Sequence, residues 1–85
     1  MNNTTTHAIT LYIGSACHLC SEAKDVIAPV LQELGWACST VNITNNADLV
    51  SLYGVRIPVI KTPGGVEKGW PFTAGQVRRL LLAEE

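Results

Sequence analysis

The feature that most constrains the fold is a strand, a helix and a second strand that follow one another in the first half of the chain. Residues 8–13, Ala-Ile-Thr-Leu-Tyr-Ile, have the composition of a β-strand, and a short Gly-Ser-Ala turn follows them. Apolar residues then recur at helical spacing over residues 19–34, and Gly35 stands where a glycine commonly ends a helix. Residues 36–43 are again rich in strand-forming side chains. Because a helix joins the two strands, we expect them to pair in parallel.

The next segment predicts a short helix followed by a hairpin. The asparagines at 45–46 are good N-caps for a helix that ends near Gly54. Residues 55–61 predict a third strand, which Pro58 interrupts, and residues 66–69 predict a short fourth strand. So few residues separate these two strands that they must form an antiparallel hairpin.

A final helix is predicted by the capping-box pair Thr73 and Gln76, which precedes apolar residues at helical spacing. The order of elements is then βαβαββα, an α/β arrangement within one domain at residues 8–85. Residues 1–7 are polar and uncharged, so we expect a flexible tail that is neither a signal peptide nor an anchor.

Composition excludes several classes of function. The chain has 85 residues, a net charge of −1 and no basic cluster, so we expect one domain that binds neither nucleic acid nor acidic membrane surfaces. No apolar run is long enough to cross a bilayer. Three cysteines, an odd number, argue against a secreted disulfide scaffold and favour a reducing compartment. We therefore expect a cytoplasmic monomer.

Two cysteines, Cys17 and Cys20, stand three positions apart where the first helix begins. Positions i and i+3 share a helix face, so the two sulfurs can close a small ring. Free backbone amides and the macrodipole at a helix N-terminus favour a thiolate at Cys17. His18 would favour that thiolate further if it were protonated, or it is an exposed residue without a specific role. Ser15 is a turn residue, or its hydroxyl caps the helix.

These elements together resemble the glutaredoxin branch of the thioredoxin fold. The resemblance covers roughly residues 9–82, and it rests on the CxxC motif after the first strand and on an apolar-Pro-apolar segment that opens the hairpin. Cys-His-Leu-Cys at 17–20 and Tyr-Gly-Val-Arg-Ile-Pro-Val at 53–59 are most similar to the small bacterial glutaredoxin-like proteins. The resemblance implies a four-stranded mixed sheet with the first and third helices on one face and the second helix on the other.

The resemblance also implies roles for individual residues. Cys17 would attack a substrate disulfide, and Cys20 would resolve the mixed disulfide. The position of Cys20 agrees with this role, because desolvation on the apolar stripe of the helix keeps its thiol protonated. Pro58 would be a cis-proline facing the motif, and the backbone of Ile57 would pair with the bound peptide or thiol. A cis bond is rare even before proline, so this assignment depends on the resemblance.

The chain departs from typical glutaredoxins at the residues that hold glutathione. Typical members have a basic residue shortly before the motif, a Thr-Val-Pro segment, and a Gly-Gly pair followed by an acidic residue. This chain has Ala16 before the motif, Arg56 ahead of Ile-Pro, and a single Gly69 followed by Trp70. Arg56 is either a carboxylate ligand or a solvated charge. Trp70, with Phe72, either forms an apolar wall for a protein partner or packs under the last helix.

We therefore expect a thiol–disulfide oxidoreductase with no tightly bound cofactor and with doubtful glutathione specificity. Its substrates would be a disulfide-containing protein or a small thiol, and glutathione or a reductase would supply electrons. The substrate-binding candidates are His18, Arg56, Ile57, Pro58 and Trp70. The alternative is a non-enzymatic module of the same fold that binds a partner or senses oxidation.

The remaining cysteine, Cys38, lies on the predicted second strand, where we interpret it as a small buried hydrophobe. A zinc site could in principle combine it with Cys17, Cys20 and either His7 or His18. Structural zinc sites usually join two paired cysteine knuckles, and this chain has one. We therefore assign no metal ligands.

Overall fold

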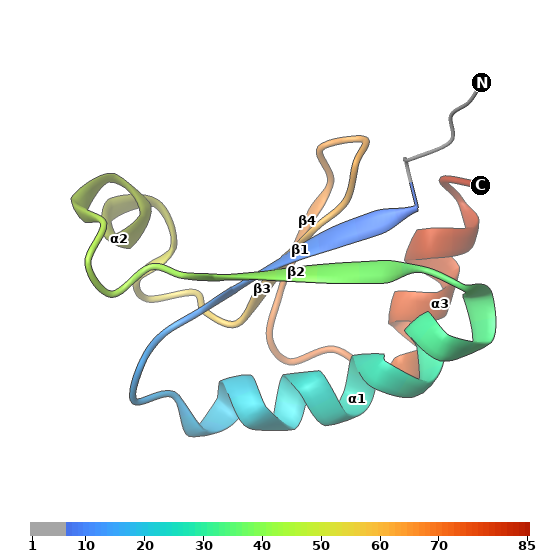
Figure 1. The fold of residues 1–85 in the computed structure, drawn as a ribbon, viewed down its shortest axis with the longest axis horizontal. Helices are drawn as coiled ribbons and strands as arrows, with labels where there is room; N and C mark the ends of the chain where they lie inside the picture. Colours follow the sequence, from blue (N-terminus) through green and yellow to red (C-terminus); the bar gives the residue numbers. More distant parts are fainter. Residues whose placement is uncertain (1–6) are drawn as a thin grey trace.

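The computed structural model describes residues 7–85 and shows the expected order of elements (Figure 1). The prediction of a flexible tail falls, except for His7, outside the described residues. His7 stacks on Trp36 with ring centroids 5.0 Å apart, and its carbonyl accepts a 2.9 Å hydrogen bond from the Ala37 amide. The elements are β1 (Ala8–Ile13), α1 (His18–Leu34), β2 (Ala37–Asn42), α2 (Ala47–Tyr53), β3 (Val59–Lys61), β4 (Glu67–Gly69) and α3 (Ala74–Leu82).

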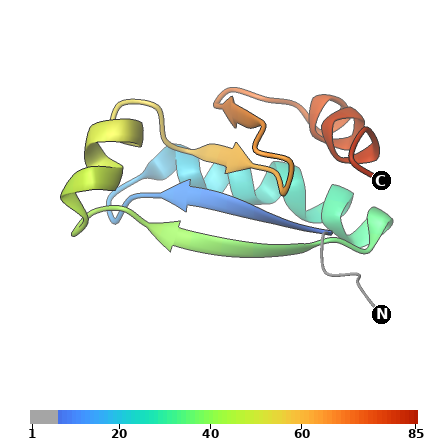
Figure 2. The same cartoon turned by 90° about the horizontal axis from the view of Figure 1, so that it is seen from above.

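The four strands form one mixed sheet in the order β2-β1-β3-β4. β1 and β2 are parallel, in register from Ala8 opposite Ala37 to Ile13 opposite Asn42. β3 runs antiparallel to both of its neighbours, β1 and β4. Figures 1 and 2 show that α1 runs along the sheet and that α3 lies beside the C-terminal end of α1. The helix α2 lies at the opposite end of the molecule from α3. This architecture is the thioredoxin-like α/β fold that the resemblance implied.

Alternation along β1 divides the core between the two faces of the sheet. Ile9 and Leu11 lie in the larger cluster, together with buried side chains of α1 and α3 such as Ile27 and Leu81. Tyr12 points to the other face, where it packs on a smaller cluster formed by Ile43, Tyr53 and Val59. The first and third helices therefore cover one face of the sheet, and α2 covers the other face at one end.

Side-chain caps begin the later helices at the predicted places. The Asn46 side chain accepts a 3.0 Å hydrogen bond from the Leu49 amide at the start of α2. At the start of α3, the Thr73 hydroxyl accepts from the Gln76 amide at 3.1 Å, and the Gln76 side chain accepts from the Thr73 amide at 3.0 Å. Each cap satisfies amides that would otherwise lack a partner, so α2 and α3 start where local chemistry predicts.

The third strand is shorter than predicted, since β3 begins only at Val59. The Arg56 and Ile57 amides both donate to the Tyr53 carbonyl, at 2.8 and 3.0 Å, so they continue the turn that ends α2. Pro58 then has no amide to donate. β4 likewise spans Glu67–Gly69, one residue less than expected. Among the described residues, no helix has the length and apolarity needed to cross a membrane.

Candidate redox site

Cys17 and Cys20 form a disulfide at the start of α1, with their Cα atoms 5.2 Å apart. Cys17 is the N-cap residue and has an extended backbone, with φ −115° and ψ 98°. Its sulfur accepts a hydrogen bond of 3.1 Å from the Cys20 amide. Cys17 therefore takes the N-cap role that the sequence left open for Ser15. Its Sγ accepts a hydrogen bond from one of the free backbone amides of the first turn.

The two cysteines differ in their exposure to solvent. Cys17 is half-buried, whereas Cys20 is 3% exposed and lies one turn into the helix, in line with the buried Ala23 and Ile27. A disulfide or thiol approaching from solvent reaches Cys17 first. Cys20, by contrast, is shielded from external reagents.

Ser15 fastens the turn before the motif to the end of β2 and to the loop that follows it. Its hydroxyl accepts a 3.2 Å hydrogen bond from the Asn42 side-chain amide. Its own backbone amide donates to the Thr44 hydroxyl at 3.0 Å. These bonds join segments 27 and 29 residues apart in the chain. Ser15 thus positions the turn that carries Cys17.

The segment at Ile57 and Pro58 faces the same turn. The Ile57–Pro58 peptide bond is cis, as is Trp70–Pro71, and Pro58 is buried. A methyl group added at Gly14 would lie 2.8 Å from Ile57 Cδ1 and 3.9 Å from Cys17 Cβ. The Ile57 side chain therefore approaches the backbone just before the motif, and only glycine at position 14 leaves room for it without displacement.

The His18 side chain is mostly exposed, and it points along the helix surface. Its Nε2 lies 2.9 Å from a carboxylate oxygen of Glu22, one turn further into α1. Such an i,i+4 pair on an exposed face contributes little to stability. The structure therefore pairs the His18 ring with the Glu22 carboxylate.

Arg56 belongs to a cluster with Glu67 and Tyr53 that the sequence alone does not predict. One Arg56 nitrogen lies 3.3 Å from a Glu67 carboxylate oxygen, and the guanidinium lies 5.5 Å from the centroid of the Tyr53 ring. The Tyr53 hydroxyl donates to the other Glu67 oxygen at 2.6 Å. The Tyr53 ring also stacks on Tyr12, with centroids 4.3 Å apart.

This cluster shifts the ionisation of two of its members. The hydrogen bond to Glu67, assisted by burial, raises the pKa of Tyr53 to about 12. The same hydrogen bond lowers the pKa of Glu67, and Arg56 lowers it further. At neutral pH the cluster therefore holds a carboxylate between a phenol and a guanidinium.

Trp70 and Phe72 take different positions. Phe72 is 4% exposed and lies in the core with Val77 of α3, so it packs under the last helix and forms no wall at the surface. Trp70 is half-buried against the same cluster and meets Phe72 edge to face, with centroids 5.0 Å apart and planes at 78°. The Trp70 amide donates to the Pro58 carbonyl at 3.0 Å, which places Trp70 directly beside the cis-proline.

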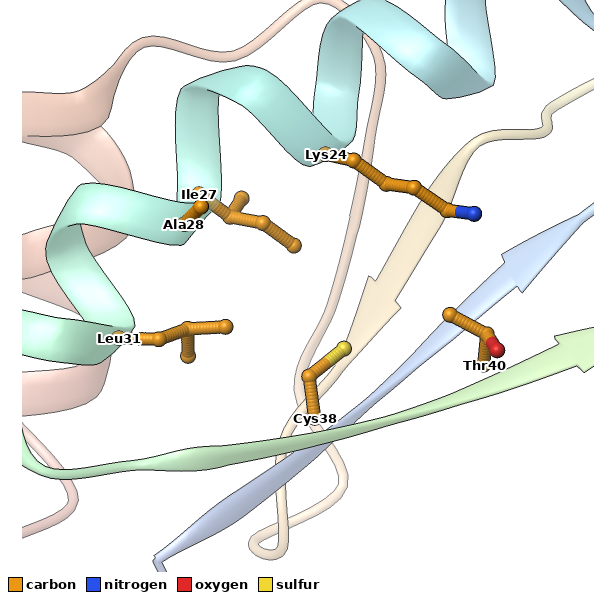
Figure 3. Close-up of a pocket in the computed structure, with 6 residues that line it drawn as sticks. All are labelled: Lys24, Ile27, Ala28, Leu31, Cys38 and Thr40. Carbon is orange, nitrogen blue, oxygen red and sulfur yellow. The ribbon is translucent and has the colours of Figure 1, made fainter.

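Cys38 is exposed on the edge strand β2, which corrects its interpretation as a buried core residue. It lies beside Ile9 near the start of β1, whereas Cys17 follows the end of that strand, so the two cysteines lie at opposite ends of the sheet. The Cys38 side chain points into a groove of about 290 Å³ between β2 and α1 (Figure 3). Burial there raises the pKa of the Cys38 thiol, and Lys24 opposes this effect.

No group of three or more His, Cys, Asp or Glu side chains placed to hold a metal ion occurs within residues 7–85. The combination of Cys38 with Cys17 and Cys20 that the sequence left open cannot form, because Cys38 lies at the far end of the sheet.

Comparisons with known proteins identify the family of this chain. Residues 8–82 match the family model described as "Glutaredoxin-like domain (DUF836)". The X-ray structure of XcR50 from X. campestris is similar, with 40% identity, a TM-score of 0.79, and coverage of 88% of this chain and 96% of that one.

Two more distant structures show the fold alone. Ne2328 from Nitrosomonas europaea is 23% identical, with a TM-score of 0.75 over 94% of this chain and 98% of that one. The J-Trx1 fragment of ERdj5 is 12% identical, with a TM-score of 0.65 over 91% of this chain and 42% of that one. No curated protein sequence matches the chain.

The family match extends from the first strand to the last helix and includes the Cys17–Cys20 pair, which supports a role in thiol–disulfide redox chemistry. The chain belongs to the glutaredoxin-like (DUF836) domain family.

Proposed function

We propose that this protein is a dithiol–disulfide oxidoreductase, with Cys17 as the nucleophile and Cys20 as the resolving cysteine. The observation that carries the proposal is the asymmetry of the pair. Cys17 caps α1, is half-buried, and its sulfur accepts a hydrogen bond from the Cys20 amide. Cys20 lies one turn further into the helix and is only 3% exposed. In the reduced protein the same amide and the helix dipole would stabilise a Cys17 thiolate.

The reaction proceeds in two exchanges. The Cys17 thiolate attacks one sulfur of a substrate disulfide, which forms a mixed disulfide and releases the other substrate sulfur as a thiolate. Cys20 then gives up its proton to solvent and attacks the Cys17 sulfur, which closes the Cys17–Cys20 disulfide and releases the second substrate thiolate. The substrate gains two electrons, and the protein dithiol loses two. Glutathione or the dithiol of a reductase would supply two electrons to restore the protein.

Apolar side chains near the motif favour a protein disulfide as the substrate. Leu19, inside the motif, is 43% exposed, and Val55, two positions before Ile57, is fully exposed. Figure 1 shows the start of α1 and the α2–β3 loop at the same end of the molecule. The Ile57 amide already donates to the Tyr53 carbonyl, so backbone pairing with a bound peptide would use the Ile57 carbonyl. Trp70 lies beside Pro58 and would border the same peptide.

Turnover on insulin disulfides tests the proposal, with electrons supplied either by glutathione and glutathione reductase or by a thioredoxin-reductase system. We expect wild-type protein to turn over with at least one donor, and Cys17→Ser to be inactive. Cys20→Ser should accumulate a mixed disulfide through Cys17, because nothing then resolves it. Cys38→Ser is the matched control and should retain full activity, since Cys38 lies at the far end of the sheet.

Two results would contradict the proposal. Activity that survives Cys17→Ser would show that another group performs the exchange. A wild-type protein that forms and loses its disulfide, yet turns over no substrate with either donor, would indicate a redox-sensing module instead of an enzyme.

A further inference from the structure

The guanidinium of Arg56 is held by a carboxylate of the same chain, that of Glu67. Glu67 offers one oxygen to Arg56 at 3.3 Å and the other to the Tyr53 hydroxyl at 2.6 Å. The Tyr53 ring, which is 5% exposed, supports the Arg56 guanidinium at 5.5 Å and is itself stacked on Tyr12. Both oxygens of the carboxylate are therefore engaged, and the phenol that anchors it is fixed in the smaller core cluster.

Arg56 is also the sequence neighbour of a residue that approaches the redox site. It precedes Ile57, whose Cδ1 comes within 2.8 Å of where a Gly14 methyl would be, and that methyl would lie 3.9 Å from Cys17 Cβ. An extended tripeptide spans about 10 Å, so one bonded through its central cysteine to Cys17 can extend its terminal carboxylates toward the segment that carries Arg56. A free arginine at position 56 could bind one of these carboxylates in a bidentate manner.

We propose that Glu67 is a specificity-determining residue, whose carboxylate occupies Arg56 and so denies that arginine to the carboxylates of glutathione. The inference deepens the proposed function and rests on it, because it names the class of thiol that the same site disfavours. Protein disulfides, which present backbone and side chains in place of a terminal carboxylate, do not need Arg56 and are unaffected by its internal pairing.

An incoming carboxylate competes with Glu67 at a disadvantage. Glu67 is already part of the fold, so its bond to Arg56 carries no cost of association, whereas glutathione must lose translational and rotational freedom to replace it. Displacing Glu67 would also leave the Tyr53 hydroxyl without the acceptor that it now has.

The test is a titration with S-methylglutathione, which carries both carboxylates but cannot form a disulfide. Binding to the wild-type protein and to Glu67→Gln is followed by NMR chemical shifts. Glutamine still accepts the Tyr53 hydroxyl hydrogen, but it removes the negative charge from Arg56. We expect about tenfold tighter binding by Glu67→Gln, the gain typical of one charge-assisted hydrogen bond.

Two further variants identify the group responsible. Glu33→Gln is the matched control, because it makes the same change of charge and also releases an arginine, Arg78, from a 2.6 Å ion pair between α1 and α3. This control should bind S-methylglutathione as weakly as the wild type. In the double variant Glu67→Gln/Arg56→Ala the tenfold gain should disappear, since the freed arginine is gone.

Equal affinity of Glu67→Gln and wild type, in a variant whose amide spectrum shows the native fold, would overturn the inference. A gain that persists in the double variant, or that Glu33→Gln reproduces, would overturn it as well. The titration measures binding and involves no turnover. Failure of the insulin assay would therefore count against the proposed function but would not change the outcome of this binding test.

Discussion

Replacement of Gly14 by alanine tests the contact that joins the two halves of the redox site. The added methyl would lie 2.8 Å from Ile57 Cδ1, closer than carbon atoms tolerate, and in ordinary contact with Cys17 Cβ and the Thr44 hydroxyl at 3.9 Å. The atom it meets is the end of a flexible side chain, so we expect the protein to fold with Ile57 displaced.

The expected change in the free energy of unfolding follows from two opposing effects. Gly14 does not adopt the left-handed conformation of Gly35 and Gly65, so alanine fits the backbone at this position. Alanine also lowers the conformational entropy of the unfolded chain, which stabilises the folded state by about 0.4–1 kcal/mol. Forcing Ile57 from its rotamer costs about 1–2 kcal/mol. Gly14→Ala alone should therefore be neutral to mildly destabilising, by at most about 1.5 kcal/mol.

Ile57→Val provides the decisive background, because valine lacks the Cδ1 atom that the methyl would meet. In that background, Gly14→Ala should stabilise by about 0.4–1 kcal/mol, so the two changes are coupled by about 1–2 kcal/mol. Urea denaturation of the two single variants and the double variant measures this coupling. Additive effects within about 0.3 kcal/mol would refute the contact, and with it the placement of Ile57 beside Cys17.

In the reduced protein, iodoacetamide at mildly acidic pH should label Cys17 well before Cys38, because Cys17 lies at a helix N-terminus whereas burial raises the pKa of the Cys38 thiol; mass spectrometry showing Cys38 labelled first would contradict this. The lowered pKa of Glu67 means that its contribution to stability is present above its ordinary pKa and is lost as the pH falls through the lowered value. Acid denaturation curves of the wild type and Glu67→Gln should therefore converge at low pH, and a constant difference between them would disprove the linkage. Thr73→Ala removes the capping box of α3 and should cost about 1 kcal/mol in urea denaturation, whereas Thr73→Ser should cost little; equal losses in the two variants would argue against the cap.

Features that depend on neighbouring residues were predictable from the sequence. The caps at Asn46 and Thr73 and the stripe that buries Cys20 each arise within one or two helical turns, where spacing decides which groups meet. The parallel pairing of β1 with β2 follows from the helix between them. The resemblance to glutaredoxins supplied the remaining topology and the place of Pro58 opposite the motif.

Features that depend on distant residues were not predictable in this way. Glu67 lies 11 and 14 residues from Arg56 and Tyr53, and only the pairing of β3 with β4 brings the three side chains together. Two residues of the expected third strand, Arg56 and Ile57, donate backbone hydrogen bonds to the Tyr53 carbonyl and so extend the turn after α2. Strand propensity, which reflects side-chain type, does not predict this pairing. Cys38 has an apolar side chain, but it lies on an edge strand, which has a neighbouring strand on one side only. The residue therefore stays exposed, although its thiol points into the groove beside α1.

The Cys17–Cys20 ring lies entirely within the first turn of α1 and links no two elements of the fold. A change of redox state should therefore affect local unfolding at the start of α1. It adds or removes no covalent link between the sheet and α3. In a hydrogen-exchange experiment we therefore expect oxidation and reduction to change protection at the start of α1, and we expect the amides of the central strand β1 to exchange through global unfolding in both states. A protein built in this way can change its thiol chemistry many times without disturbing the scaffold that presents it.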